Sequence, residues 1–546
     1  MEEVYHIHQD CLTELSYLII YDEHVLFQLS CVSKFATSLF LFRHSLKPKT
    51  NYTLKNFNKF KHLKYLDLSY SSKYTNLTNI KHLERLTLGR YINELNLNNY
   101  SKLTYLDCMF RKYPMDILSC INLVELNAIY SDGIENLIHL QNLLCVFNEE
   151  VHKIVYFTSL LQLTKLYLGY SRRSYVSYQS VIFSENCQLI DLKAEYIDFS
   201  SKIVNTKQMK KLVLIGCLNI LYLNLPIIQT MTLDNVVNFN ILDEDNSYKY
   251  LTHLIFGLND RTLKFENMIS LRFIELRKSN DNMMNSLATL SFLYDIQYAH
   301  SKRHTVNISN LNNVTHLKFI NSDEVDEWYI PRNLKSLEIA NADGRKNWSS
   351  NILNQINAMT NLTSLNIRKI TFVDNQRILY LKNTTLQHLC LIFSHSDSFD
   401  ELISLTSLKL NSVDIHSVIF YPLTNLKILT LTDCSSRRKI LKCTLSTFIN
   451  LEVLELNHVR GMINILYFAN ITRLTVNTRD KNIRISNANK LKYLQIVELN
   501  SVDTFLGFCK KGFSESVRDI YISYHDKINN ILNITMKNVN IHFVRE

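Results

Sequence analysis

Glycine and proline are scarce in this chain of 546 residues, with 9 and 5 occurrences. So few glycines exclude Gly-rich phosphate-binding loops, and the scarcity of both residues excludes long flexible linkers. No apolar run approaches the length of roughly 18 residues that a membrane-spanning helix needs. Glu2 and Glu3 stand where a signal peptide would carry basic residues. The sequence therefore predicts neither a signal peptide nor a membrane span.

The 11 cysteines are scattered and include no C-x-x-C pair. This spacing predicts neither a zinc site nor a disulfide framework, and it favours a reducing, cytoplasmic environment. His6 and His8 are better interpreted as exposed side chains than as metal ligands. The motifs G-x-S-x-G, H-E-x-x-H and the P-loop are absent. We therefore expect a protein that is not an enzyme and that needs no metal or cofactor.

Charge gives little support for nucleic-acid or membrane binding. The net charge of +10 is spread over the whole chain, and basic and acidic clusters alternate. A nucleic-acid surface would need a stripe of one sign with interleaved aromatic residues. We therefore predict no nucleic-acid and no membrane partner; a weaker alternative, recognition of either one, rests only on the pI of about 8.8.

The most regular feature is the pattern L-x-x-L-x-L, repeated about every 20 residues. It occurs at Leu63-Leu66-Leu68 and returns late at Leu451-Leu454-Leu456. The last two leucines alternate with a polar residue, which predicts a short strand with one apolar face. A fixed period of this length predicts a solenoid in which the strands form a parallel sheet and the leucines stack inward.

The segments between the strands carry two kinds of apolar spacing. Val306 and Ile308, like Ile483 and Ile485, alternate as in a strand. Ile352, Ile356 and Met359 have helical spacing instead. We therefore expect an α/β repeat with a parallel concave sheet and a convex side that mixes short strands with short helices.

The repeat resembles the leucine-rich-repeat family over most of the chain, and this resemblance implies a solenoid over residues 63–525 that binds a partner protein. That family usually places Asn or Cys three residues after the last strand leucine. Here the position holds Cys217 and Cys434, but also Ser71, Val236 and Val413. Without an Asn ladder, some turns must satisfy their buried backbone groups by other means. We predict that Cys217 and Cys434 are buried as small apolar residues.

The first 45 residues do not fit the leucine repeat. Their apolar spacing predicts three short helices, with Leu12, Leu15, Leu18 and Ile19 on the first. Asp22 is expected to cap a second helix, and Ser33 a third that carries Phe35, Leu39 and Phe40. The order of these elements resembles the F-box, although the usual Leu-Pro opening is absent and Phe35 stands where many members have Trp.

The F-box resemblance implies a substrate-recognition subunit of a cullin-based ubiquitin ligase. Residues 1–45 would dock on a Skp-type adaptor, and the repeats would hold an unknown substrate protein. Residues 46–62 would form a linker and N-terminal cap, and residues 526–546 a C-terminal cap. The alternative is a scaffold whose head only caps the solenoid. The adaptor-binding residues implied by the resemblance are Leu12, Leu15, Leu18, Leu26, Leu29 and Val32.

Substrate contact is expected at the strand positions that face away from the leucine core. These positions mix both charges with tyrosines, which is typical of a protein-binding face. In the early repeats the predicted residues are Tyr65, Asp67, Arg85, Tyr105, Asp107, Glu125, Lys165 and Tyr167.

Overall fold

The fold is described from a computed structural model of the chain. The structure describes residues 17–20, 38–41, 62–69, 80, 82–89, 97, 100–109, 117–147, 154–170, 178–183, 188–199, 207–219, 225–237, 248–257, 265–277, 287, 289–299, 305–320, 327–340, 347–348, 350–368, 371–372, 381–392, 399, 401–413, 423–434, 448–459, 463–466, 470–477, 483–486, 490–497, 517–524 and 540–545.

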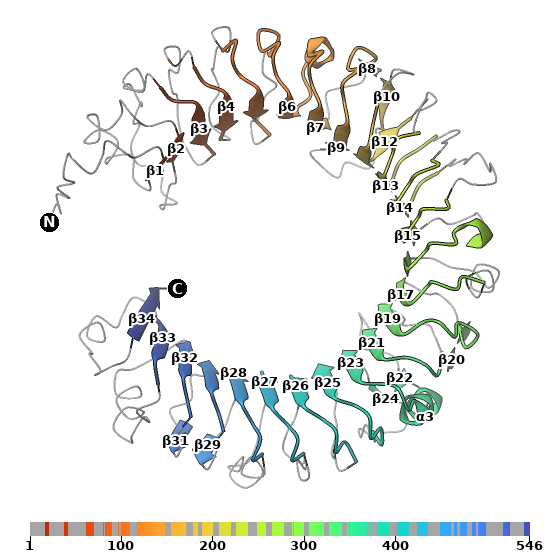
Figure 1. Ribbon diagram of the computed structural model, residues 1–546, viewed down its shortest axis with the longest axis vertical. Coiled ribbons are helices and arrows are strands. Elements are labelled where there is room, and N and C mark those ends of the chain that lie inside the picture. The colour runs from red at the N-terminus through yellow and green to blue at the C-terminus, as the bar shows by residue number, and fades with distance from the viewer. Residues whose placement is uncertain are drawn as a thin grey trace, which may run out of the picture. The chain divides into compact units, whose positions relative to one another are not determined.

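The chain divides into two compact units, Met1–Arg261 with Asn267–Leu271, and Thr262–Glu266 with Arg272–Glu546. In each unit taken by itself, the strands of a parallel sheet line the inner side of successive coils, and shorter elements lie on the outer side (Figure 1). This arrangement agrees with the solenoid and the concave sheet that the leucine pattern predicts.

The sheet of the first unit follows chain order, and each strand pairs in parallel with the next. Its strands are β1 (Tyr17–Ile20), β2 (Ser38–Leu41), β3 (Tyr65–Leu68), β4 (Arg85–Leu88), β5 (Tyr105–Asp107), β6 (Glu125–Ile129), β7 (Asn142–Phe147), β9 (Lys165–Tyr170), β11 (Asp191–Glu195), β13 (Lys211–Ile215), β14 (Thr230–Asp234) and β15 (His253–Gly257).

The second unit repeats the same parallel order. Its strands are β16 (Phe273–Leu276), β17 (Asp295–Ala299), β19 (His316–Ile320), β21 (Ser336–Ala340), β23 (Ser364–Arg368), β25 (His388–Ile392), β26 (Ser407–Asn411), β27 (Ile428–Thr432), β28 (Val453–Asn457), β30 (Arg473–Asn477), β32 (Tyr493–Val497), β33 (Asp519–Tyr524) and β34 (Asn540–Arg545).

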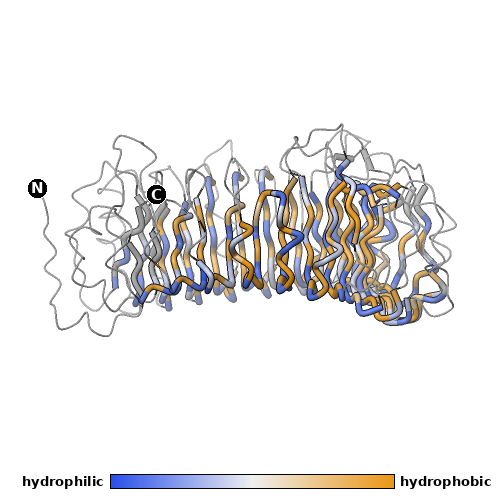
Figure 2. Tube along the Cα trace, turned by 90° about the horizontal axis from the view of Figure 1, so that it is seen from above, coloured by the Kyte–Doolittle hydropathy of each residue, from blue (hydrophilic) through white to orange (hydrophobic). Residues whose placement is uncertain are grey.

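The leucine ladder is the core of each unit. Leu66 pairs in register with Leu86, and Leu86 with Leu106, so that equivalent leucines stack from coil to coil. All three are at most 2% exposed. Hydrophobic segments recur in coil after coil (Figure 2). Coil length varies without disturbing this register: Leu126 and Leu143 are 17 residues apart, whereas Leu166 and Leu192 are 26 apart.

The helical head expected in the first 45 residues is not found in the parts of that segment that the structure describes. Tyr17–Ile20 and Ser38–Leu41 are strands; Leu18 pairs with Leu39, and Leu39 with Leu66. The helical assignment is therefore wrong at Leu18, Ile19, Leu39 and Phe40. The physical reason is that a short apolar run suits a strand as well as a helix, and pairing with β3 decides between them.

The sheet also extends toward the other end of the chain. β34 pairs with β33 along its whole length, inside the segment expected to be a separate cap. Sheet strands thus occur from residue 17 to residue 545, on both sides of the predicted range 63–525.

The outer side mixes strands and helices, as the sequence predicts. In the first unit, the elements are η4 (Ile134–Asn136) and a three-stranded parallel sheet of β8 (Val155–Phe157), β10 (Gln179–Phe183) and β12 (Ile197–Asp198). In the second unit, they are the pairs β18 (Thr305–Asn307) with β20 (Glu327–Tyr329), β22 (Asn347–Trp348) with β24 (Thr371–Phe372) and β29 (Ile463–Leu466) with β31 (Ile483–Ser486), and the helix α3 (Ser350–Ala358). A single helical turn, η5 (Phe265–Asn267), lies between β15 and β16 along the chain.

Threonine and asparagine side chains bond backbone carbonyls of the preceding coil at exposed positions before the strands. Just before a strand, Thr104 Oγ1 donates to the Glu84 carbonyl at 3.2 Å and Thr252 Oγ1 to the Gln229 carbonyl at 3.0 Å. In the turn before β6, Asn122 Nδ2 donates to the Ser101 carbonyl at 2.7 Å. Each bond joins one coil to the coil before it. These bonds lie before the strands and not at the turn that follows them, so the expectation about the turns without an Asn ladder stays a prediction.

Cys217 and Cys434 are fully buried, as predicted. Their thiols also donate to carbonyls of the preceding coil, Cys217 to Ala194 at 3.3 Å and Cys434 to Leu410 at 3.5 Å. Burial raises the pKa of Cys217 to about 12. These thiols therefore act as packing groups that close the turn.

This burial predicts selective alkylation. At pH 8.5, Cys217 should resist iodoacetamide in the folded chain, whereas the half-buried Cys390 should react slowly and both should react fully in urea. An unfolded thiol ionises near pH 8.5 but folded Cys217 only near 12, so its contribution to stability is lost as the pH rises through that window. Mass spectrometry of alkylated peptides measures the order, and native labelling of Cys217 as fast as Cys390 would contradict it.

Candidate binding site

The sheet of the first unit presents a polar face opposite its leucine core. Because side chains alternate along a strand, the residues between the buried leucines point outward. All eight predicted substrate-contacting residues occupy such positions and are exposed or half-buried. The sequence prediction of their orientation is therefore confirmed.

Neighbouring strands tie several of these side chains together. The Arg85 guanidinium lies over the Tyr105 ring, 4.2 Å from its centre. Asn127 Nδ2 donates to Asp107 Oδ2 at 3.0 Å. Burial raises the pKa of Tyr105, Asp107 raises it further and Arg85 opposes both. The phenol therefore stays neutral at physiological pH and presents a rigid amphipathic ring beside a cation.

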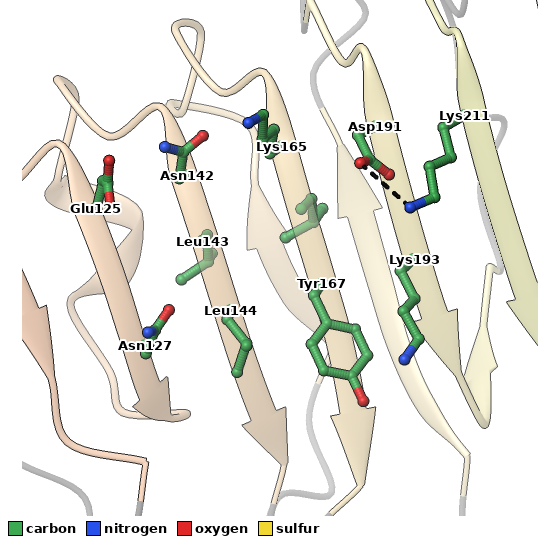
Figure 3. A pocket seen from close by; sticks show the side chains of 11 residues that line it. Glu125, Asn127, Asn142, Leu143, Leu144, Lys165, Tyr167, Asp191, Lys193 and Lys211 are labelled. Carbon is green, nitrogen blue, oxygen red and sulfur yellow. Dashed lines mark ion pairs between the residues drawn. The ribbon is translucent and has the colours of Figure 1, made fainter. Parts of the chain in front are cut away.

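A hollow of about 280 Å³ lies on this face, over β6, β7, β9, β11 and β13 (Figure 3). Its volume is at the small end of ligand pockets, which suits one or two side chains of a larger partner. The residues that line it are Glu125, Asn127, Asn142, Leu143, Leu144, Lys165, Leu166, Tyr167, Asp191, Lys193 and Lys211.

The lysines of the hollow differ in their partners. Lys193 Nζ lies 2.8 Å from Glu195 Oε1 and 4.3 Å from the centre of the Tyr167 ring. The hydrogen bond to Glu195 raises the pKa of Lys193. Lys211 Nζ lies 4.0 Å from Asp191 Oδ2, a loose pair. Lys165 is exposed and has no ion-pair partner among the described residues.

Three of the predicted residues, Glu125, Lys165 and Tyr167, meet at the hollow. The other five, Tyr65, Asp67, Arg85, Tyr105 and Asp107, lie on β3, β4 and β5 of the same face and do not line it. Residues that the prediction missed complete the hollow: Asn142, Leu144, Asp191, Lys193 and Lys211. Their signal was the same repeat at lower regularity, as in Leu140-x-x-Leu143-x-Cys145.

The predicted adaptor-binding residues cannot be assembled into a site in the same way. Leu18 belongs to β1, where only the backbone is described. Leu12, Leu15, Leu26, Leu29 and Val32 lie outside the described residues.

The outward face of the second unit carries its own network. Glu338 Oε1 forms ion pairs with Lys318 Nζ at 3.5 Å and with Arg368 Nη2 at 3.4 Å. Near the end of the chain, Tyr521 stacks on His542 with ring centres 4.4 Å apart, and His542 Nε2 lies 3.6 Å from Asp519 Oδ1. These side chains are largely engaged with one another.

Neither a membrane-spanning helix nor a metal-holding cluster occurs among the described residues. No helix among them is both long and apolar enough to cross a membrane. No group of three or more His, Cys, Asp or Glu side chains in the described parts is placed to hold a metal ion.

Comparison with known proteins identifies the fold. No family model matches the chain, and no curated protein matches it in sequence. Among solved structures, the TLR13–ssRNA13 complex is similar over 94% of this chain and 81% of that chain, with 14% identity and a TM-score of 0.50. CroV588, described as a novel circular LRR protein structure, is covered over 100% of both chains, with 14% identity and a TM-score of 0.47.

These similarities concern the backbone. The leucine ladder, the in-register parallel strands and the short outer elements, together with the similarity to the TLR13–ssRNA13 complex, show that the chain folds as a leucine-rich-repeat solenoid.

Proposed function

We propose that this chain is a non-enzymatic scaffold that binds a partner protein through the polar face of its first unit. The observation that carries the proposal is the composition of that face. Tyrosines, an arginine, lysines and carboxylates stand at outward positions of a sheet whose other face is fully buried. Tyr and Arg dominate the energetics of protein interfaces. A stack of coils holds these side chains in fixed register, which lowers the entropy cost of binding.

The proposal predicts that Arg85→Glu weakens partner capture at least tenfold. The substitution removes the cation that lies over Tyr105 and reverses the charge of an exposed position. Tenfold corresponds to about 1.4 kcal/mol, which is modest for an interface arginine. The full chain would be immobilised, exposed to lysate of its own source cells treated with ribonuclease, and the captured proteins quantified by mass spectrometry.

Lys207→Glu is the matched control, because exposed Lys207 lies in the turn before β13 and off the sheet face. Proteins retained by wild type and Lys207→Glu but depleted by Arg85→Glu would support the proposal. Equal capture by all three chains would contradict it. Proteins captured from untreated lysate, with none captured from the lysate treated with ribonuclease, would point to RNA, the kind of molecule present in the TLR13–ssRNA13 complex.

A second proposal is that the chain is the substrate receptor of a cullin-based ubiquitin ligase. It rests on the F-box resemblance of residues 1–45, and strands β1 and β2 favour the scaffold instead. The same capture experiment separates the two. A Skp-type adaptor and a cullin among the retained proteins would support the ligase role, and partners without them would leave the scaffold.

A further inference from the structure

We propose that the hollow over β6–β13 binds a helical segment of the partner through three anchors. An acidic side chain meets Lys165, a basic side chain meets Glu125, and an aliphatic side chain rests on Leu144, which lies on the strand between them but one outward position further along it. This inference deepens the proposed function and rests on it. It names the chemistry of the segment that the polar face recognises.

The hollow has an apolar side chain, Leu144, at an outward position of β7. Along the middle outward position of consecutive strands, Asp67, Thr87, Asp107 and Asn127 are polar, and Leu144 and Tyr167 follow them. Leu144 is half-buried although it points away from the core, and Asn127 and Tyr167 flank it. An aliphatic side chain from a partner would be removed from water there, at about 25 cal/mol per Å² of apolar area buried.

The charged side chains of the hollow differ in whether they already have a partner within the chain. Lys193 is held by Glu195 and the Tyr167 ring, and Lys211 pairs with Asp191. The side chains of Glu125 and Lys165 make no hydrogen bond or ion pair within the described part of the chain. Both line the hollow; Asn142 stands between them on β7, and Leu144 lies one outward position further along that strand (Figure 3). A bound partner would therefore find one unpaired anion and one unpaired cation.

The spacing of Glu125 and Lys165 across the strands matches the spacing of residues on one face of a helix. Glu125 pairs in register with Asn142, and Asn142 with Lys165, so the two charged residues stand two strands apart in one row. Two strand spacings are about 10 Å. Residues i and i+7 on one face of a helix are also separated by about 10 Å, with i+3 and i+4 between them. In an extended segment, same-face residues fall at about 7 or 13 Å, which fits less well.

The geometry thus points to an acidic and a basic residue seven apart, in either order, with an aliphatic residue three or four positions from each. This is the anchor pattern of a helix lying in a groove. Charges of opposite sign at the two ends also fix the direction of the helix, because the reversed segment would place like charges together.

The test is selection from a displayed library of random 18-residue peptides on the full chain. We expect enrichment of the acid, aliphatic and base pattern at i, i+3 or i+4, and i+7. A doubly charge-reversed chain, Glu125→Lys with Lys165→Glu, keeps the net charge and should still enrich an acid and a base seven residues apart, whereas Lys165→Glu alone should enrich two basic residues at that spacing. Synthetic peptides of the selected sequence should bind Lys165→Glu at least tenfold more weakly than wild type.

Lys409→Glu is the control, since exposed Lys409 occupies an outward position of the second unit, away from the hollow, and its substitution should leave affinity unchanged. Peptides that depend on Arg85 but not on Glu125 or Lys165 would overturn the inference and leave the proposed function standing. Failure to recover any peptide, together with equal lysate capture by wild type and Arg85→Glu, would refute both. Selected peptides without the seven-residue charge spacing would overturn the helical anchor.

Discussion

Replacing Phe157 by alanine is expected to lower the free energy of unfolding of the first unit by about 3–5 kcal/mol. Phe157 is 1% exposed at the end of β8, beneath the outer sheet. Its ring lies 5.9 Å from that of Phe183, which lies 6.2 Å from Phe199. Truncation would leave a cavity within this aromatic row. It would also remove the contact between β8 and β10 in a row that continues to Phe199, the residue after β12.

Tyr156→Ala is the control within the same strand. Tyr156 is 52% exposed and points to the other side of β8, so its removal should change stability by less than about 0.5 kcal/mol. Urea denaturation with hydrogen exchange of β8, β10 and β9 would measure both variants. Exchange is needed because a repeat array can open locally. Equal effects of the two substitutions would show that β8 does not pack as described.

The second large effect is expected from Asn383→Leu, at about 2–4 kcal/mol. Asn383 is 3% exposed, and its Nδ2 donates to the carbonyls of Ile356 at 3.1 Å and Met359 at 2.7 Å. Its Oδ1 accepts from the backbone N–H of Thr385 at 3.1 Å. One amide from the next coil thus satisfies the C-terminal end of α3. Leucine fills a similar volume but removes the bonds to the Met359 carbonyl and the Thr385 N–H, while the Ile356 carbonyl keeps only the N–H of Met359.

The matched control is Asn425→Leu, because exposed Asn425 makes one bond, to the Ile403 carbonyl at 2.9 Å, that water can replace. Its expected cost is below about 1 kcal/mol. Urea denaturation would give the free energies, and hydrogen exchange should show faster exchange in α3 for Asn383→Leu only. A cost no greater than that of Asn425→Leu would mean that the amide does not sustain the end of α3.

The core strands could be predicted because alternation fixes which side of a strand is buried. Leu66 and Leu68 require the same placement as Leu454 and Leu456, and one-residue slips would expose them. The first strands were missed although Leu15-x-x-Leu18-x-Ile20 follows the same spacing as the repeat. Leu12, Leu15, Leu18 and Ile19 also satisfy a helical period, and only pairing with a neighbouring strand separates the two.

The candidate site was predictable in orientation but not in extent. The outward positions of Tyr65 and Lys165 follow from their leucine neighbours. The hollow depends on which side chains stand next to each other across strands, as Asn142 stands between Glu125 and Lys165. Coils of 17 and 23 residues hide this juxtaposition in the sequence. The ion pairs that leave Lys165 available, such as Lys193 with Glu195, are likewise three-dimensional facts.

The tolerance of the sheet to coil length bears on how such a chain can change over generations. The strands at both ends stay in register although Leu126 and Leu143 are 17 residues apart and Leu166 and Leu192 are 26 apart, so the segments between strands can change in length without shifting the sheet. A lineage can therefore gain and lose residues there while every outward side chain keeps its neighbours. Point substitutions at positions such as 144 or 165 alter recognition without touching the core. Inheritance of the scaffold and diversification of what it recognises are thereby uncoupled.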